Sequence, residues 1–446
     1  GGDPDDPDTW VTITGACFGT DPAAITVLFG TAEAEIVSIT DTEIVVVPPP
    51  GTPGAVDVTV LGTDCGDLDE PDGYTYEEVI DEFPDGEPPP DASKFVPVAP
   101  CRLLDTRDPG ETKFAHDTSR TLQVGGRCDV PENAIAVSLT LTVDAAEQAG
   151  FITAWPEGDR PEVSNLNFMP GDTRANGAVV RVGEGGSVEL YAWSNTHLVV
   201  DVSGYWVKTQ GTSAGRFVGS DPVRLLDTRE GGLTPFAAGE TRTIPLPDGV
   251  PSDAVAVAIN LTLDDSVSAN FMTAWAAGEE RPWASAVNTD DAHQTRAASL
   301  IVPVSAEGFS LYSLHGGTAV VDYTGYFTGE SAEQRALGLF VPQAPVRVID
   351  TRESEPIAGD SSIEVDTGIP GSSVIINVTM VDTTAPNFLT VWPAGIDEMP
   401  WVSAVNSYGD PAVANLAIVG QTEQLLRIYS LVESDVVVDV SGYFFS

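Results

Sequence analysis

Arg102-Leu-Leu-Asp-Thr-Arg107 occurs three times in this chain, because it returns as Arg224-Leu-Leu-Asp-Thr-Arg229 and as Arg347-Val-Ile-Asp-Thr-Arg352. The copies begin at residues 102, 224 and 347, and so lie 122 and 123 residues apart. Each copy ends on an Asp-x-Ser/Thr-Gly-Tyr-aromatic phrase, which spans Asp201–Trp206, Asp322–Phe327 and Asp439–Phe444. Solenoid repeats are only about 20–50 residues long, so the repeated unit is a whole domain.

Short apolar runs with turn residues between them fill each repeat. In the first copy the clearest are Ala134–Val143, Gly150–Trp155, Ala178–Val182, Val188–Trp193 and His197–Tyr205. Such runs are typical of β-strands, and helical periodicity is missing from them. Residues 1–78 show the same alternation, for example in Ile44-Val-Val-Val47 and Val56-Asp-Val-Thr-Val60. The sequence therefore predicts an all-β chain of tandem β-sandwich domains, the repeats being sandwich or jelly-roll-like modules.

The predicted boundaries follow from the repeats and from one acidic, proline-rich stretch. Residues 79–94 contain Pro84, Pro88, Pro89 and Pro90 among acidic residues, a composition that favours an extended and stiff linker. We expect a first domain at 1–78, this linker at 79–94, and repeats at 95–207, 216–328 and 339–446. Short seams between the repeats indicate an elongated string of domains.

The chain is strongly acidic. Its 67 Asp and Glu residues against 20 Lys and Arg residues give a formal charge of −47. Such a surface repels the phosphate backbone of nucleic acids, so we expect no nucleic-acid partner. No segment approaches the ~20 consecutive apolar residues that cross a bilayer, and no signal-peptide core is present. We therefore expect no membrane insertion.

Cys101 and Cys128 are predicted to bond to each other. Both are present in the first repeat, and both are replaced in the other two, where Val223 and Val346 stand at the position of Cys101. Joint presence and joint loss are expected of a bonded pair. Disulfides form in oxidising compartments, so the pair indicates an extracellular or cell-surface location.

The N-terminal region resembles the IPT/TIG family of immunoglobulin-like domains. The resemblance rests on motifs such as Gly15-x-x-Phe-Gly19, Val27-Leu-Phe-Gly30 and Pro71-Asp-Gly-Tyr-Thr-Tyr76. It implies a spacer or interaction module with no single activity. In such a strand order Cys17 and Cys65 lie in loops at the same end, which predicts a second disulfide.

The repeats resemble modules that occur in several copies in secreted proteins of actinobacteria. The signature is Phe-Val-x-x-x-Pro-x-Arg-Leu-Leu-Asp-Thr-Arg at the start and Val-Val-Asp-Val-x-Gly-Tyr-Phe at the end, and it covers residues 95–446. The resemblance implies a secreted or wall-associated module without a defined activity.

The recurring arginines and aspartates predict an ion-pair network that ties the first strand of each repeat to the last. Arginine suits this role because its planar fork pairs with carboxylates at two points. The alternative is that the arginines recognise an acidic sugar. The members are Arg102, Asp105, Arg107 and Asp201 in the first repeat, Arg224, Asp227, Arg229 and Asp322 in the second, and Arg347, Asp350, Arg352 and Asp439 in the third.

The tryptophans suggest two roles. Trp155, Trp275 and Trp392 end a recurring strand, which favours a place in the core. Trp283 and Trp401 follow a proline in the second and third repeats only, and they are candidates for a glycan-stacking platform. The sequons at Asn260 and Asn377 lie within predicted strands, so these asparagines are expected to serve the fold.

No motif proposes a reaction, a cofactor or a metal site. Gly211-Thr-Ser-Ala-Gly215 matches a nucleophile elbow by its letters, but it lies in a seam between β-domains and not between a strand and a helix. The four histidines share no ligand spacing; they are His116, His197, His293 and His315. We expect neither catalytic, cofactor-binding nor metal-binding residues.

A chain that triples one domain without an enzyme-like segment is expected to be structural or adhesive. The leading prediction is an extracellular surface protein, the protomer of a head-to-tail fibre, with other copies of itself as partner. The competing prediction is a carbohydrate-binding accessory chain of a cell-wall enzyme, with a surface polysaccharide as partner.

Overall fold

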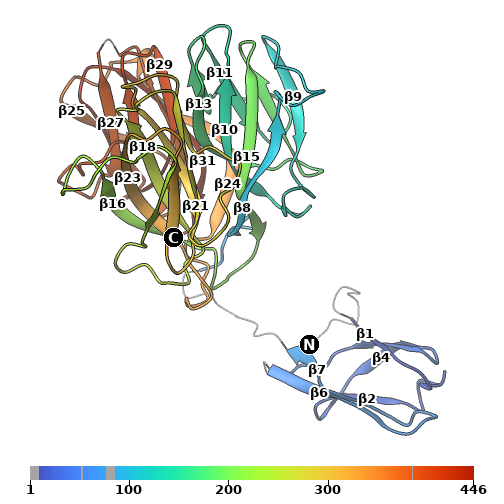
Figure 1. Ribbon diagram of the computed structural model, residues 1–446. Coiled ribbons are helices and arrows are strands. Elements are labelled where there is room, and N and C mark those ends of the chain that lie inside the picture. Colours follow the sequence, from blue (N-terminus) through green and yellow to red (C-terminus); the bar gives the residue numbers. More distant parts are fainter. Residues whose placement is uncertain (1–9, 52–53, 77–85, 384) are drawn as a thin grey trace. The chain divides into compact units, whose positions relative to one another are not determined.

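The computed structural model describes residues 10–51, 54–76, 86–383 and 385–446. The chain divides into two compact units, Gly1–Glu82 and Phe83–Ser446. Both units are built from β-strands, as Figure 1 shows, with a single 3-10 turn at Thr351–Glu353 among the described residues. No helix in the described ranges is long and apolar enough to span a bilayer. Much of the predicted linker, residues 79–85, lies outside the described residues, as does the N-terminal segment 1–9.

The first unit is a small antiparallel sandwich. One sheet has the strand order β1-β5-β4 and the other the order β3-β2-β6-β7. Alternate residues of these strands point inward, and Val27, Ile44 and Val46 are fully buried between the sheets. The strands are β1 Val11–Thr14, β2 Thr26–Phe29, β3 Ala32–Glu33, β4 Glu35–Ile39, β5 Glu43–Val47, β6 Gly54–Leu61 and β7 Leu68–Tyr76.

Each repeat contributes eight strands to the second unit. The first repeat has β8 Ser93–Asp105, β9 Thr118–Gln123, β10 Ala136–Asp144, β11 Gly150–Trp155, β12 Leu166–Phe168, β13 Arg174–Arg181, β14 Ser187–Ala192 and β15 His197–Lys208. The second has β16 Phe217–Asp227, β17 Glu240–Ile244, β18 Ala256–Asp264, β19 Asn270–Ala276, β20 Val287–Thr289, β21 Arg296–Pro303, β22 Phe309–Ser313 and β23 Thr318–Phe327. The third has β24 Phe340–Asp350, β25 Ser361–Asp366, β26 Ser373–Val381, β27 Asn387–Pro393, β28 Val405–Ser407, β29 Ala412–Gly420, β30 Leu425–Ser430 and β31 Asp435–Phe444.

The strand order makes each repeat a jelly roll. In the second repeat one sheet runs β16-β23-β18-β21 and the other runs β17-β22-β19-β20, so the first and last strands are neighbours. The other repeats follow the same order, and one bridge between Phe340 and Ser93 joins the inner sheets of the first and third repeats. The predicted all-β fold, with one immunoglobulin-like domain and three jelly-roll-like modules, is confirmed.

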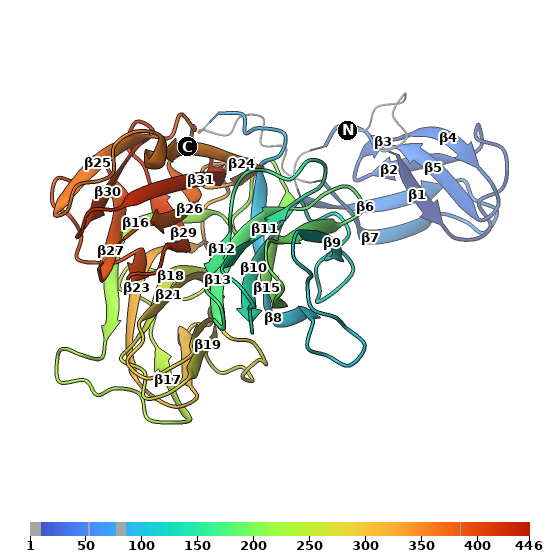
Figure 2. The ribbon, with the colours of Figure 1, turned by 90° about the horizontal axis from the view of Figure 1, so that it is seen from above.

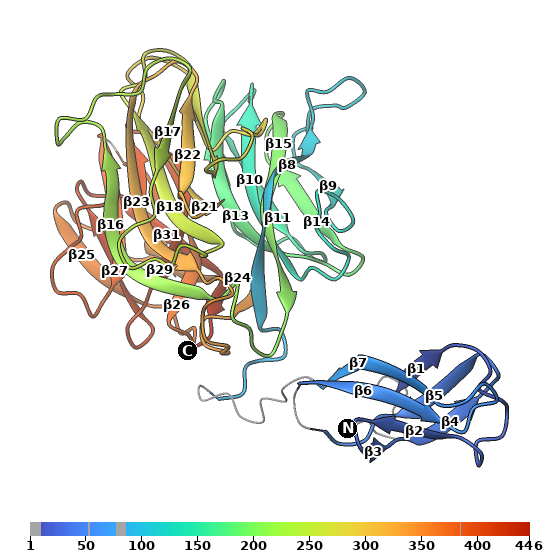
Figure 3. The same ribbon diagram turned by 60° about the horizontal axis from the view of Figure 1, so that its bottom comes forward.

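The three repeats are packed together and not strung out. Each repeat has its own apolar core, but a fourth core collects side chains from all three. Figure 2 shows the repeats arranged around a common centre, and Figure 3 shows them side by side in a second view. The expectation of an elongated string of repeats is therefore wrong.

The shared core explains why aromatic residues recur at the two ends of every repeat. The rings of Phe95 and Phe327 lie 4.5 Å apart, those of Trp206 and Phe340 4.8 Å apart, and those of Phe217 and Phe444 4.4 Å apart. Each of these pairs joins two different repeats, and all six side chains are at most 4 % exposed. Left on separate domains they would expose large apolar patches, which water disfavours.

The seams between the repeats are tied into this assembly. The Gly215 carbonyl accepts a hydrogen bond from the Phe95 amide, and the Gly338 carbonyl accepts one from the Phe217 amide. Both glycines have positive φ, and an added Cβ would meet a backbone oxygen at 2.2 and 2.4 Å. Gly215 therefore has to be glycine, and Ser213 lies between two strands and not on a strand-to-helix turn.

Phe327→Ala is expected to destabilise the whole second unit and not one repeat alone. Removal of a fully buried phenylalanine costs about 3–5 kcal/mol, and this ring contacts rings of the first and third repeats. Urea unfolding followed by circular dichroism should show one transition at lower urea. Leu233→Ala, at a 52 % exposed site, is the matched control and should change little. Separate melting of the second repeat with the others unaffected would contradict the shared core.

Candidate functional site

The structure brings together the recurring arginines and aspartates of each repeat. Arg102 lies on β8 opposite Asp201 on β15. Its Nε donates to Asp201 Oδ1 at 2.7 Å, and its Nη1 donates to Asp105 Oδ2 at 2.8 Å. Asp105 also accepts the backbone N–H and the Nε–H of Arg107. One guanidinium thus connects the first strand to the last, while a second one holds the turn that follows the first strand.

The second and third repeats reproduce this geometry. Arg224 Nε is 2.7 Å from Asp322 Oδ1, and Arg347 Nε is 2.8 Å from Asp439 Oδ1. The turn pairs are Arg229 with Asp227 and Arg352 with Asp350. The strand aspartates Asp201, Asp322 and Asp439 are buried, and the arginines that join the strands are about one-third exposed. The part of each arginine that faces solvent could still contact a ligand.

The two aspartates of each network have pKa values that move in opposite directions. The hydrogen bond from Arg107 lowers the pKa of Asp105 to about 2, and the one from Arg229 lowers the pKa of Asp227 to about 2. Burial raises the pKa of Asp201 and Asp322, although Arg102 and Arg224 oppose this effect. The turn aspartate is therefore the stronger acid.

The strand-joining arginines also connect the repeats into a ring. Arg102 Nη2 donates to the Trp283 carbonyl of the second repeat at 2.8 Å. Arg224 Nη2 donates to the Trp401 carbonyl of the third repeat at 2.9 Å, and Arg347 Nη2 donates to the Glu162 carbonyl of the first repeat at 2.6 Å. Each repeat thus binds the next, and the third repeat binds the first. This set of contacts was not predicted from the sequence.

The two sequon asparagines support the same interfaces. Asn260 donates to the Ser403 carbonyl and Asn377 to the Ser164 carbonyl, each at 2.5 Å and each across two repeats. Both asparagines are at most 7 % exposed. A buried side chain with this role is a fold residue, as the strand pattern predicted.

The tryptophans separate into two groups. Trp155, Trp275 and Trp392 are at most 4 % exposed, and each indole N–H donates to a nearby backbone carbonyl. Trp283 and Trp401 are 89 % and 81 % exposed, although their carbonyls accept the inter-repeat hydrogen bonds. These two rings therefore stand in solvent beside two of the three interfaces.

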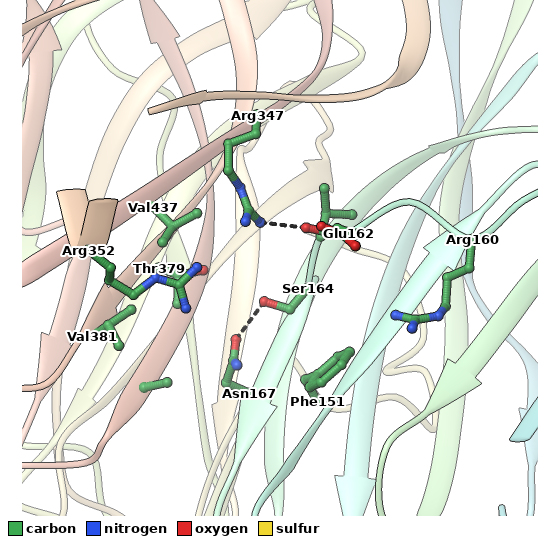
Figure 4. Close-up of a pocket in the computed structure, with 12 residues that line it drawn as sticks. Phe151, Arg160, Glu162, Ser164, Asn167, Arg347, Arg352, Thr379, Val381 and Val437 are labelled. Atoms are coloured by element: carbon green, nitrogen blue, oxygen red, sulfur yellow. Dashed lines mark hydrogen bonds between the residues drawn. The ribbon is translucent and has the colours of Figure 1, made fainter. Parts of the chain in front are cut away.

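Hollows occur at the interfaces between repeats. One of about 310 Å³ lies between the third and first repeats, and Figure 4 shows Arg160 and Arg352 pointing into it from opposite sides. Another of about 270 Å³ lies between the second and third repeats at the equivalent position. Each has an arginine pair of the network on one wall and a Ser-x-x-Asn motif on the other; these are Arg347, Arg352, Ser164 and Asn167 in the first hollow, and Arg224, Arg229, Ser403 and Asn406 in the second.

Charged residues also meet where the inner sheets converge, and sequence reasoning missed them. Arg174 Nη2 is 2.8 Å from Asp410 Oδ2, and Arg296 Nη1 is 3.2 Å from the same oxygen. The cluster joins all three repeats, because Arg174, Arg296 and Asp410 come from the first, second and third. Its only signal in the sequence is a Thr-Arg pair that recurs at Arg174 and Arg296, and the third repeat has Val413 in its place.

The cysteine predictions are confirmed. Cys17 bonds to Cys65 within the first unit, with Cα atoms 5.7 Å apart, and Cys101 bonds to Cys128 within the first repeat, with Cα atoms 5.8 Å apart. Among the described residues no group of three or more His, Cys, Asp or Glu side chains could hold a metal ion.

Acidification is expected to protonate Asp201 and Asp322 before Asp105 and Asp227. Asp105 and Asp227 ionise at about 2 when folded and at 3.8 ordinarily. Their charged forms therefore stabilise the fold above pH ~4, and this stabilisation is lost as the pH falls towards ~2. Asp201 and Asp322 act in the opposite sense. Because folding raises the pKa of these two carboxyl groups, they contribute most to stability below pH ~4, where they are protonated, and this contribution is lost as the pH rises.

Carbon-detected NMR of the carboxyl groups measures this order. Asp105→Asn and Asp201→Asn would assign the two signals of the first repeat. A titration midpoint of Asp105 at or above that of Asp201 would contradict the arrangement of hydrogen bonds described above.

Comparison with known proteins identifies the first unit. Residues 2–77 match the family model of the IPT/TIG domain, which confirms the resemblance of this region. No curated protein matches the chain.

Solved structures of low similarity include two from viruses. A structure titled "Life in the extremes: atomic structure of Sulfolobus Turreted Icosahedral Virus" is 10 % identical, covers 78 % of this chain and 91 % of its own, and has a TM-score of 0.16. Another, titled "The Triple Jelly Roll Fold and Turret Assembly in an Archaeal Virus", is 8 % identical, with coverage of 78 % and 92 % and a TM-score of 0.15.

A third structure is the Bacteroides ovatus mixed-linkage glucan utilization locus protein SGBP-B in complex with a mixed-linkage heptasaccharide. It is 10 % identical, covers 98 % of this chain and 92 % of its own, and has a TM-score of 0.14. Scores this low carry no argument about function. The family match covers residues 2–77, which form the IPT/TIG domain.

Proposed function

We propose that this chain is an extracellular, non-catalytic adhesive protein that binds a surface polysaccharide through Trp283 and Trp401. The observation that carries the proposal is the exposure of these rings, 89 % and 81 %, in a protein that buries Trp155, Trp206, Trp275 and Trp392. An indole whose face is open to solvent is available to an apolar partner. The apolar C–H face of a sugar ring is such a partner, because it can stack on the indole.

The backbone at both positions is fixed, which suits a binding platform. The carbonyls of Trp283 and Trp401 accept hydrogen bonds from Arg102 and Arg224. The guanidinium of Arg281 lies 6.0 Å from the Trp283 ring centre and 3.7 Å from that of Tyr312, so the loop around Trp283 is held further. A ring on a fixed backbone loses little conformational entropy when it binds.

The disulfides and the IPT/TIG domain support an extracellular place for this activity. The resemblance of residues 95–446 to secreted actinobacterial modules is in accord with it. In this proposal the IPT/TIG unit is a spacer, and the three-repeat unit carries the binding surface.

Alanine at Trp283 and Trp401 is expected to weaken retention on insoluble polysaccharide. The wild-type chain should bind peptidoglycan, chitin or cellulose saturably, and each single substitution should weaken binding by about tenfold, since loss of an aromatic contact costs on the order of 1–2 kcal/mol. The exposed apolar residue Val267, which is 68 % exposed and lies in another loop, provides the control Val267→Ala. Equal retention of the wild type and the double variant on every polymer would reject the proposal.

A second candidate is assembly into a head-to-tail fibre. The fibre prediction depends in part on an elongated chain of separate repeats, and the three repeats are instead packed together. The IPT/TIG unit favours it in one respect, because β1 and β4 are the edge strands of a three-stranded sheet. An edge strand can pair with an extended segment of another copy, and a contact of this kind that does not close into a ring propagates as a filament.

Fibre formation is tested by light scattering and electron microscopy of the full chain. The charge of −47 opposes the approach of two copies, and salt weakens this repulsion. The average mass should therefore rise with protein concentration in high salt with calcium, and regular filaments should appear. A sharp mass of one chain at all concentrations would rule the fibre out.

A further inference from the structure

The hollow between the third and first repeats differs from its counterpart in one substitution. In the first two repeats the turn arginine has a second carboxylate partner, since Arg107 Nη1 is 3.3 Å from Asp144 and Arg229 Nη1 is 3.2 Å from Asp264. In the third repeat Val381 occupies this strand position. Arg352 pairs with Asp350 through Nε and Nη2, and its Nη1 has no partner among the described residues.

The first repeat adds, on the opposite wall, a guanidinium that has no ion-pair partner among the described residues. The guanidinium of Arg160 lies 4.0 Å from the ring centre of Tyr191 and 6.0 Å from that of Phe151. Stacking on Tyr191 orients the guanidinium, and none of its N–H groups bonds to a described residue. In the equivalent hollow Met399 stands at the position of Arg160. Only one of these two hollows therefore contains unsatisfied guanidinium groups.

The remaining lining combines apolar surface with a few polar atoms. Phe151, Val381 and Val437 form the apolar part of the wall. The side-chain oxygen of Asn167 accepts a hydrogen bond from Ser164, and the side-chain NH2 group of Asn167 has no partner among the described residues. Glu162 also lines the hollow and makes no ion pair there. The lining thus carries three guanidinium groups and one carboxylate; Arg347 and Arg352 are paired with Asp439 and Asp350, so Arg160 is the guanidinium that lacks an ion-pair partner among the described residues.

We propose that this hollow binds a sugar acid of the uronate type. Arg160 binds the carboxylate with its planar fork, because all of its donors are available. Arg352 Nη1 on the opposite wall, and the Asn167 side-chain amide on the same wall as Arg160, donate to hydroxyl oxygens of the ring. The C–H face of the ring packs on Phe151 and Val437. About 310 Å³ lies at the lower end of the range for small-molecule pockets, so the hollow suits a small ligand.

A pyranose acid fits these features better than simpler ligands. A simple carboxylate such as acetate would pair with Arg160 but would leave the apolar wall exposed to solvent. A neutral sugar would use the wall but leave Arg160 without a counter-charge. This proposal goes beyond polysaccharide binding by the exposed tryptophans, because the hollow contains neither of them.

NMR titration of the full chain with D-glucuronate, D-glucose and acetate tests the proposal. D-glucuronate should give saturable shifts at the amides that line the hollow, and D-glucose and acetate should bind at least about tenfold more weakly. Arg160→Gln should weaken D-glucuronate binding by about tenfold, and Arg160→Lys should recover only part of it, since lysine lacks the fork. Glu162→Gln should strengthen binding, because it removes the one carboxylate of the lining.

Val381→Asp is the most specific variant, because it restores the arginine–aspartate pair of the other repeats. It should abolish D-glucuronate binding with little change in melting temperature. Asp264→Val combined with Met399→Arg should create a second site in the equivalent hollow, so that the proposal stays testable if Val381→Asp fails to fold. Trp283→Ala and Trp401→Ala should leave D-glucuronate binding unchanged, which separates this site from the polysaccharide platform.

Three outcomes would overturn the inference. The first is the absence of saturable shifts with D-glucuronate. The second is equal binding of D-glucuronate and D-glucose, which would show that the carboxylate is not recognised. The third is unchanged binding in both Arg160→Gln and Val381→Asp.

Discussion

The bidentate pair between Arg102 and Asp201, with its two counterparts, is the interaction on which the second unit depends. It joins the first and last strands of a jelly roll, which are neighbours in the sheet but come from opposite ends of the repeat. Buried ion pairs are expensive to desolvate and give net stability only with good geometry. Here Nη2 of the same guanidinium also donates to a backbone carbonyl of another repeat. One side chain thereby fixes the closure of a repeat and its position against a neighbour.

The three repeats close into a ring because each strand-joining arginine bonds both within its own repeat and to another repeat. A head-to-tail contact either closes or propagates, depending on the rotation between successive units. In this chain three copies complete the turn, and the third repeat bonds to the first. The aromatic side chains at the ends of the repeats then meet in one core. On separate domains the same side chains would form large exposed apolar patches, which are unfavourable in water. The interfaces that result are the places where the chain can form binding surfaces, and they are not equivalent in chemistry. Two have an exposed tryptophan, and the hollow at the third has the unpaired guanidinium of Arg160 opposite the partly paired one of Arg352.

Most of the local structure could be predicted from the sequence. Alternating apolar residues indicated strands in both units, and the resemblance of the first unit to IPT/TIG domains is confirmed. The disulfide of the first repeat followed from the joint loss of Cys101 and Cys128 in the other copies. Trp155 and its equivalents were placed in the core because they recur at a strand end. The cluster of Arg174, Arg296 and Asp410 could not be predicted, because its members come from three different repeats. Only Arg174 and Arg296 share a sequence motif, the Thr-Arg pair.

The sequence by itself determined the repeat, its strands, its disulfide and the set of arginines and aspartates that recur in it, because these depend on short-range patterns and on copies that can be compared. Only the tertiary structure decided how the repeats pack. Short seams between repeats are compatible with an extended string of repeats or with a closed ring of repeats. Which of the two forms depends on whether the surfaces of repeats that are distant in sequence are complementary. The same holds for the hollow between the third and first repeats. Val381 and Arg160 are unremarkable in their own segments, and their combined effect exists only because the ring closure places them on opposite walls of one cavity.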